Sequence, residues 1–423
     1  MSEYVYLSFK LGLAIAVIIL QNELNENGKA DDEYDYFCPI CGSKLNSKGL
    51  KERTINSLIG KLTWKRRVLR CPKGCEIGQI APFDEKLNIK PYQKYSSEVI
   101  KMACLLAIFV PYQIAAKILK QLTGVSICTN TIWNWVQNKG EEINTKVQEE
   151  LKLLESGQTL EPEEIDPEIS SLPMVIGADG VFVPFRPETN SPEGKTVWYE
   201  VKVGIIGRIA KRLNSKGKEV SFIARKRLVA ILGDICKFKP LLMLLSVKEG
   251  IKTARQVVWL SDGGKGFWGA YKELFSKTAQ GILDFYHASQ NIWKAAKAWL
   301  DGRTKMAQDW FSGARKKLKN GKASEIIEEL RAEVKENQKL SDETTEEMER
   351  VSNYLEDHID HMDYKSYKAS GLPIGSGIVE SACKWLIQQR FKGVGMRWSV
   401  EGFNNLLHLR LAWVNENFDD AFG

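Results

Sequence analysis

Five segments typical of β-strands lie between residues 174 and 288, and they constrain the fold of this chain more than any other feature. They are rich in Val, Ile, Phe, Trp and Tyr, and helical segments separate the later ones. Strands that alternate with helical patterns in this way predict an α/β core. The five segments read MVIGADGVFVPF, VWYEVKVGIIGRI, VSFIARKRLVAIL, QVVWLSDGG and GILDFYHA.

The chain has 423 residues, which is long for one hydrophobic core, so we expect roughly two to four structural units. Changes in composition predict a finer division into six segments. These are an N-terminal helix with a zinc-binding module (1–92), a helix-turn-helix DNA-binding domain (93–150), an acidic linker (151–172), the first part of the α/β core (173–294), a helical insertion (295–370), and the last core helices with Glu380 (371–415).

The net charge is compatible with an acidic partner such as nucleic acid but does not require one. The chain has 60 Lys and Arg residues and 53 Asp and Glu residues, which gives a formal charge of +7. The apolar run Leu11–Leu20 is shorter than the ~20 residues of a membrane span, so no membrane partner is expected. A signal peptide is an alternative, but no small-residue cleavage site follows the run. We expect a buried helix that packs on the next module.

Four cysteines near the N-terminus have the spacing of a metal site. Two close pairs, CPIC and CPKGC, lie about thirty residues apart, and two tight turns of this kind can offer four thiolates to a tetrahedral Zn²⁺. The sequence predicts structural zinc; four ordinary buried thiols are the alternative. The proposed ligands are Cys38, Cys41, Cys71 and Cys75.

Residues 96–140 have the pattern of a helix-turn-helix, with a third helix that begins near Thr129. Its apolar residues Ile132, Trp135 and Val136 are expected to face inward. The outward face could then enter a major groove of DNA, because Asn and Gln read adenine and Lys binds phosphate. A plain three-helix packing unit is the alternative. The outward residues are Asn130, Trp133, Asn134, Gln137 and Lys139.

Acidic residues follow or interrupt three of the predicted strands. Asp179 could lie in a hairpin turn, and Asp262 could cap a helix, if each is taken alone. Glu380 is the single acid between residues 371 and 400 and lies in the first turn of a predicted helix. Together these three could supply the hard oxygen ligands of a two-metal site for phosphoryl transfer, with Mg²⁺ or Mn²⁺. Asp284 and His287, at a predicted strand end, could support that site, although His287 could equally be an ordinary half-buried side chain.

Basic residues follow Glu380. We expect Arg390, Lys392 and Arg397 to contact DNA phosphates, and Trp385 or Trp398 to pack or to stack on a base. A solvated basic face with core tryptophans is the alternative.

These residues resemble a known family, the DDE transposases of prokaryotic insertion sequences, and within it the ISKra-type group. The resemblance extends from about residue 38 to about residue 412, and its most specific block is LPIGSGIVESACKWLIQQRFKGVGMRWS. The other blocks are ADGVFVPFR, WYEVKVG, WLSDGGKGFW, ILDFYHA, the CPIC and CPKGC region, and VPYQIAAKILKQLTGVSI.

The resemblance implies an α/β RNase H-like catalytic domain with a helical insertion, preceded by the zinc-binding module and the helix-turn-helix. Asp179, Asp262 and Glu380 would form the DDE triad and hold two Mg²⁺ or Mn²⁺ ions, and Asp284 and His287 would support it. The implied function is binding of the terminal inverted repeats of an insertion sequence, then strand cleavage and transfer into target DNA.

The implied protein is a homodimer or higher oligomer, in the cytoplasm of a prokaryote and associated with its nucleoid. Two other functions stay open. One is a non-catalytic, transposase-derived DNA-binding regulator, and the other is an RNase H-like nuclease or resolvase.

Overall fold

The computed structural model describes residues 2–30, 35–158, 160, 162–187 and 195–422. The chain divides into two compact units, one that ends at Lys139 and includes Phe422, and one from Gly140 to Ala421. Helix α5 (Thr129–Glu155) continues through this division. The finer division into six segments stays a prediction.

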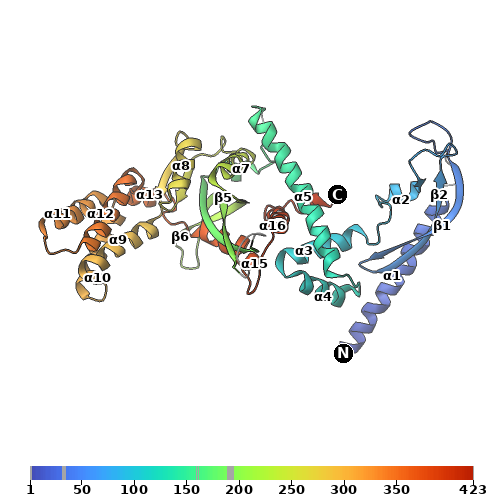
Figure 1. Cartoon of the computed structure of the whole chain (residues 1–423), viewed down its shortest axis with the longest axis horizontal. Coiled ribbons are helices and arrows are strands. Elements are labelled where there is room, and N and C mark those ends of the chain that lie inside the picture. The colour runs from blue at the N-terminus through green and yellow to red at the C-terminus, as the bar shows by residue number, and fades with distance from the viewer. Residues whose placement is uncertain (1, 31–34, 159, 161, 188–194, 423) are drawn as a thin grey trace. The chain divides into compact units, whose positions relative to one another are not determined.

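A β-hairpin and one long helix form the beginning of the first unit (Figure 1). Strands β1 (Asn46–Ser57) and β2 (Gly60–Arg70) are antiparallel, and the short β3 (Gln79–Ile80) pairs only with the end of β2. The rest of the β2 edge lies beside helix α1 (Ser2–Ala30). Its Gln21 and Asn25 side chains accept hydrogen bonds from the backbone N–H groups of Thr63 and Lys65. These contacts satisfy donors that an open strand edge would leave exposed.

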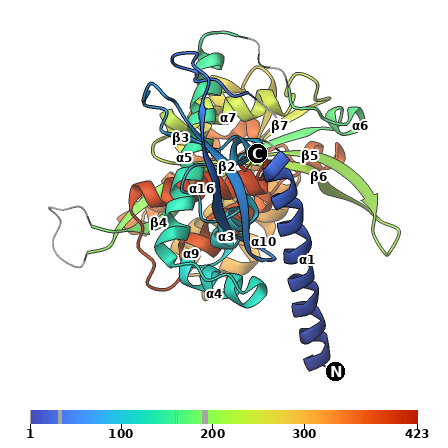
Figure 2. The same ribbon diagram turned by 90° about the vertical axis from the view of Figure 1, so that its right-hand side faces the viewer.

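Helix α1 is not the buried helix that the sequence predicts. Only part of it packs on the hairpin, through side chains such as Val17 and Leu24. Tyr4 is 76% exposed, Leu11 62% and Ile19 64%, and the N-terminal half extends past the hairpin (Figure 2). Within the described ranges, α1 is the one helix long and apolar enough to cross a membrane. Core helices and signal sequences meet the same criterion, so it does not assign a membrane.

Three further helices of the chain agree with the pattern read from the sequence. After α2 (Pro82–Lys86) come α3 (Ser97–Phe109) and α4 (Tyr112–Thr123), and α5 follows. Ser96 caps α3 by accepting a hydrogen bond from the Val99 N–H, and α4 ends at Gly124, whose φ of 76° suits glycine.

A five-stranded mixed sheet is the centre of the second unit, in the order β6-β5-β4-β7-β8. β4 is antiparallel to β5 and parallel to β7, and β6 and β8 are the edge strands. The sequence therefore predicted the α/β core correctly. The strands are β4 (Met174–Phe185), β5 (Val197–Leu213), β6 (Glu219–Leu232), β7 (Val257–Ser261) and β8 (Ala279–Leu283).

Helices surround this sheet and extend beyond it. A continuous hydrophobic core joins the sheet to α7–α9 and to the helical segment α10–α12, which lies to one side of the strands in Figure 1. The helices are α6 (Pro167–Ser170), α7 (Ile235–Lys248), α8 (Lys265–Leu274), α9 (Phe285–Leu300), α10 (Lys305–Lys319), α11 (Ala323–Glu336), α12 (Asp342–Asp357), α13 (Tyr364–Ala369), α14 (Gly377–Ala382), α15 (Gln389–Phe391) and α16 (Val400–Val414). A π-helical segment, η3 (Cys383–Gln388), joins α14 to α15.

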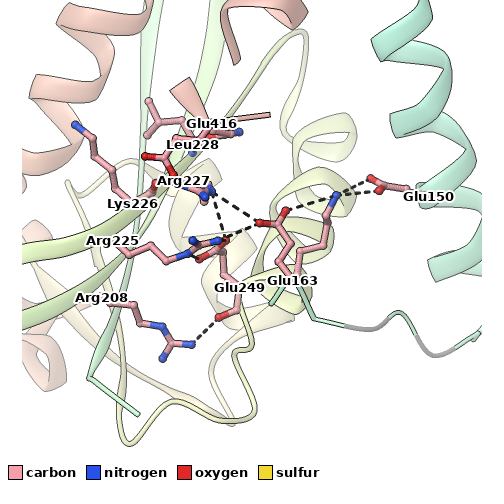
Figure 3. A network of polar contacts seen from close by, with 11 residues as sticks. Glu150, Glu163, Arg208, Arg225, Lys226, Arg227, Leu228, Glu249 and Glu416 are labelled. Atoms are coloured by element: carbon pink, nitrogen blue, oxygen red, sulfur yellow. Dashed lines mark hydrogen bonds and ion pairs between the residues drawn. The ribbon is translucent and has the colours of Figure 1, made fainter. Parts of the chain in front are cut away.

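The described part of the acidic linker is attached to the core by ion pairs (Figure 3). Glu163 pairs with Arg225 on β6 at 3.0 Å, and Arg225 also binds the buried Glu249 at 2.8 Å. The Glu163 N–H donates to the Lys248 carbonyl oxygen. Residues 159 and 161 of this linker lie outside the described residues. The linker is thus in contact with β6 and α7 through Glu163, whose side chain is 34% exposed, so solvent partly screens these ion pairs.

Candidate active site

Asp179 lies inside strand β4, opposite Val203 of β5, so the Asp-Gly pair is not a hairpin turn. Its Oδ1 accepts a hydrogen bond from the Gly180 N–H. Two residues earlier, a Cβ on Gly177 would lie 2.4 Å from Val379 of α14. Glycine is needed there because only a bare backbone lets α14 pack this close to β4.

Asp262 follows the last residue of β7 and begins the loop to α8. Its Oδ1 accepts a hydrogen bond from the Gly264 N–H at 3.0 Å. Gly264, not Asp262, is the N-cap residue of α8, so Asp262 is not a helix cap. The half-buried Asp262 carboxylate therefore ends a buried parallel strand, a position typical of ligand-binding residues in α/β sheets.

Asp284 is the N-cap residue of α9 and is 1% exposed. His287 is in the first turn of that helix, whereas the sequence predicted a strand end. The cap explains the difference, because Asp284 accepts the His287 backbone N–H at 2.6 Å and so begins the helix there. The His287 ring also lies 3.1 Å from the same carboxylate oxygen.

Hydrogen bonds move the pKa values of this pair in opposite directions. Burial disfavours the Asp284 carboxylate, but hydrogen bonds from His287 and Ser376 outweigh it and lower the pKa of Asp284. The hydrogen bond to Asp284 raises the pKa of His287. The pair is therefore charged on both sides over a widened pH range.

The glycine-rich turn before Glu380 is tied to Asp284. The Ser376 N–H donates to Asp284, and the Phe285 N–H donates to the Ile374 carbonyl oxygen. The Glu380 N–H then donates to the Ser376 carbonyl oxygen at 3.1 Å, in the first turn of α14. Asp284 therefore positions the helix that carries Glu380. The π-helical segment η3 follows directly, and such segments are frequent at functional sites.

The three acids of the predicted triad influence one another. Burial raises the pKa of Asp179, and the negative charges of Asp262 and Glu380 raise it further, while His287 opposes them. Their ligand oxygens do not form a set that lies mutually within 4.8 Å, the spacing that the four cysteine sulfurs meet in the described part of the chain. Hard carboxylate oxygens from separate elements, with mutual repulsion to relieve, suit Mg²⁺ or Mn²⁺.

The four cysteines of the first unit form a second candidate metal site. Their sulfur atoms lie within 4.8 Å of one another, and the Cys41 and Cys71 sulfurs are 3.5 Å apart. Tetrahedral zinc with Zn–S bonds of about 2.3 Å needs sulfur separations of about 3.8 Å. Without a metal the four thiols share their protons unevenly: hydrogen bonds from Ser43 lower the pKa of Cys41 to about 6, and hydrogen bonds with Cys41 and Cys71 raise the pKa of Cys75 to about 12. The set of Cys38, Cys41, Cys71 and Cys75 could therefore hold zinc.

The predicted outward face of α5 is partly confirmed. Asn130 and Asn134 are exposed, and Trp133 is 39% exposed. Gln137 is buried, at 5% exposed, and Lys139 is half-buried, because the buried stripe of α5 is wider than Ile132 and Val136 alone. The prediction that Gln137 faces outward is wrong.

The basic residues after Glu380 are also partly exposed and partly buried. Lys392 and Arg397 are exposed. Arg390 is 2% exposed and its guanidinium lies 5.1 Å from the Trp398 ring centroid, so the predicted phosphate contact is wrong for this residue. Trp398 is structural as well, because its indole N–H donates to the Phe391 carbonyl oxygen.

Sequence analysis missed three exposed aromatic residues near these acids. Phe182 on β4 is 54% exposed, Trp198 on β5 is 52% exposed, and Tyr286 beside Asp284 is 55% exposed. The strand period of two places Phe182 on the face opposite Asp179, but only the packed structure tells whether that face is covered.

Comparisons with known proteins give distant similarities. No family model matches the chain. It is 23% identical over 379 residues to a "UPF0236 protein in vanSb 3′region" of Streptococcus gallolyticus, covering 88% of this chain and 74% of that protein. Among solved structures, it is similar to a chain of the "Drosophila P element transposase strand transfer complex". There the identity is 10% and the TM-score 0.27, over 80% of this chain and 83% of that chain. A TM-score this low carries no argument about fold, and the ISKra-type group stays a resemblance.

Proposed function

We propose that this chain is a DNA transposase with an RNase H-like catalytic domain and a DDE triad of Asp179, Asp262 and Glu380. The strand order β6-β5-β4-β7-β8, with three antiparallel and then two parallel strands, supports this fold assignment. The observation that carries the proposal is geometric: Asp179 and Asp262 each follow a residue of the Ala178–Ser261 pair of parallel strands β4 and β7, and Val379, next to Glu380, packs against Gly177 of β4.

Each acid has a defined task in this proposal. Asp179, Asp262 and Glu380 hold divalent cations, which when bound supply the charge that activates water and stabilises the leaving oxygen of a phosphodiester. Asp284 holds the glycine turn and thus the position of Glu380. His287, whose pKa is raised, places a positive charge beside the acids and can hydrogen-bond to a phosphate.

The DNA would contact exposed basic and polar residues of both units. Lys392 and Arg397 follow the triad helix and bind phosphates, and Asn130, Trp133 and Asn134 read the ends of the insertion sequence from α5. Coordinated cleavage of two ends implies an oligomer, most simply a dimer.

The test is incubation of the full chain with the DNA that flanks its own gene, in Mg²⁺ and in EDTA, with each cut mapped to the nucleotide. We expect cuts at the element ends in Mg²⁺ and none in EDTA, followed by joining of the released 3′ end to a second DNA. Cutting without joining would identify a nuclease or resolvase, and binding of the ends without any cut would identify a regulator.

A further inference from the structure

The β4–β5 ribbon continues beyond Asp179 and carries two exposed aromatic rings on one face. Phe182 is 54% exposed and Trp198 is 52% exposed. On the opposite face Val181, Val183 and Phe185 are buried. Side chains alternate along a strand, so the ribbon packs one face on the core and presents the two aromatic rings on the other.

The strand register makes the two rings neighbours. Phe182 lies opposite Glu200 and Pro184 lies opposite Trp198, so Phe182 and Trp198 are a diagonal pair on one face. Diagonal neighbours are about 7–8 Å apart, within reach of aromatic side chains. The buried Pro184 lies directly opposite Trp198 and gives the ribbon a rigid backbone at this point.

A lysine lies beside one ring of the pair. The Lys392 Nζ lies 5.5 Å from the Trp198 ring centroid, and Lys392 is itself exposed. The backbone of Trp398 pairs with the end of β4, on the side that β7 does not reach. Arg397, the residue before Trp398, is exposed. Among the described residues of the ribbon, the acid Glu200 lies opposite Phe182 and pairs with Lys202 at 2.6 Å.

We propose that Phe182, Trp198 and Lys392 form a platform on which an unpaired base of DNA stacks, while Lys392 and Arg397 hold its phosphates. Exposed rings flanked by cations suit the π-face and the backbone charge of a single strand. Bases inside a duplex are already stacked, so the occupant is an unpaired nucleotide. A protein partner fits less well, because lysine is depleted from the centres of protein interfaces. The platform rests on the proposed function, because it would bind an unpaired stretch of the same DNA on the face of β4 opposite Asp179.

The test measures binding of a short oligothymidylate to the full chain in EDTA, where no cleavage occurs. Trp198→Ala and Phe182→Ala should each weaken binding roughly tenfold, and Trp198→Phe should retain most of it. Leu213→Ala is the matched control, because Leu213 lies on β5 and is 71% exposed. Its affinity should equal that of the wild type. An oligonucleotide of the same length without bases should bind the wild type and both alanine variants equally.

Lys392→Gln should reduce the slope of the logarithm of the binding constant against the logarithm of salt concentration by about 0.7. This is the value for one phosphate contact on a single strand. Unchanged affinity of both alanine variants would overturn the platform. A change in oligomeric state by light scattering, with oligonucleotide binding intact, would overturn it in favour of a protein interface. Neither result depends on cleavage. If wild-type ends are cut in Mg²⁺ while the alanine variants bind normally, the platform fails and the transposase assignment stands.

Discussion

The two candidate metal sites of this chain differ in how completely the protein alone assembles them. In the first unit four cysteine sulfurs lie within 4.8 Å of one another, a full set of ligands for tetrahedral zinc. In the second unit the acids come from separate elements and do not form so tight a set in the described structure. Structural metal sites take all their ligands from the protein. Mg²⁺ keeps several bound waters and therefore needs fewer protein ligands.

Charge explains this difference. A thiolate and the thiols beside it can share protons in hydrogen bonds, as the Cys41 and Cys71 sulfurs do at 3.5 Å, so four cysteines can approach with little repulsion. Carboxylates repel, and the raised pKa of Asp179 reflects its burial together with the charges of Asp262 and Glu380. Under the proposed function, zinc at the cysteine site would stabilise its module, and a cation at the acidic site would relieve the repulsion between carboxylates.

The largest expected effect is on stability, at the cysteine site. Among the described residues, Leu45 and Leu69 are the buried partners of Cys38 and Cys71 in the hydrophobic cluster around the site, so a bound metal would supply much of the local stability. The variant Cys38→Ser with Cys41→Ser should lose its zinc, and the N-terminal module should unfold at lower denaturant. Zinc sites of this class are worth about 10–16 kcal/mol in isolated peptides. Elemental analysis and urea titration are the measurements.

The control for this prediction is Cys128→Ser, because Cys128 is exposed and lies outside the cluster. It should keep the zinc content of the wild type. Equal zinc in the double variant and the control would show that the four cysteines are ordinary thiols.

The next effect is on cleavage, at the acidic site. Glu380→Gln removes a charge at almost constant volume and should slow end cleavage on the order of 10³-fold, because a metal ligand contributes several kcal/mol. End binding should be unchanged, as measured by gel shift. Glu401→Gln is the control, because Glu401 is also in a first helical turn, that of α16. Normal cleavage by Glu380→Gln would remove that residue from the triad.

A smaller effect is expected at Asp284, which acts on Glu380 and His287 without belonging to the triad. Asp284→Asn should slow cleavage about 10–100-fold, as is usual for residues that orient metal ligands. It should also lower the pKa of His287, measured by NMR titration, because the charged hydrogen bond is lost. Asp234→Asn, at the N-cap of α7, is the control for loss of a charged cap. An unchanged His287 pKa would show that the pair is not coupled.

The same pair gives a pH dependence with a defined sign. The pKa of His287 is raised by folding, so its stabilisation is complete below its unfolded pKa and is lost as pH rises through the folded value. The pKa of Asp284 is lowered, so its stabilisation is present above its unfolded pKa and is lost as pH falls through the folded value. The free energy of unfolding of the second unit should therefore be greatest between the folded-state pKa values of Asp284 and His287. Asp284→Asn should flatten the dependence of this free energy on pH.

The smallest effect is expected where the linker joins the core. Glu163→Gln weakens the ion pair with Arg225, but the Glu163 side chain is 34% exposed, so solvent screens the pair. The free energy of unfolding should fall by about 1 kcal/mol or less. The exposed neighbour Glu164 provides the control variant Glu164→Gln, which should change nothing in the same urea titration. A loss equal in both variants would mean that the network does not hold the linker.

Local patterns in the sequence predicted more of this structure than contacts between distant segments did. Strand β4 covers the same residues as the segment MVIGADGVFVPF, because β-type apolar residues continue on both sides of Asp179 and Gly180. His287 was placed on a strand because the helix that contains it begins with a cap, Asp284, inside an apolar run. The burial of Gln137 and Arg390, and the exposure of α1, depend on how helices pack against distant segments. Spacing along the chain carries no such information.

The most direct test of the central claim is to change the softness of one proposed metal ligand. Asp262→Cys suits this better than a change at Asp179, because Asp179 lies 3.9 Å from the thiol of Cys383. If Asp262 holds the metal, Asp262→Cys should cut the element ends far more slowly than the wild type in Mg²⁺ and regain activity in Mn²⁺, the softer ion. Cutting as fast as the wild type in Mg²⁺, or equally slow cutting in both metals, would contradict the claim that this acid binds metal.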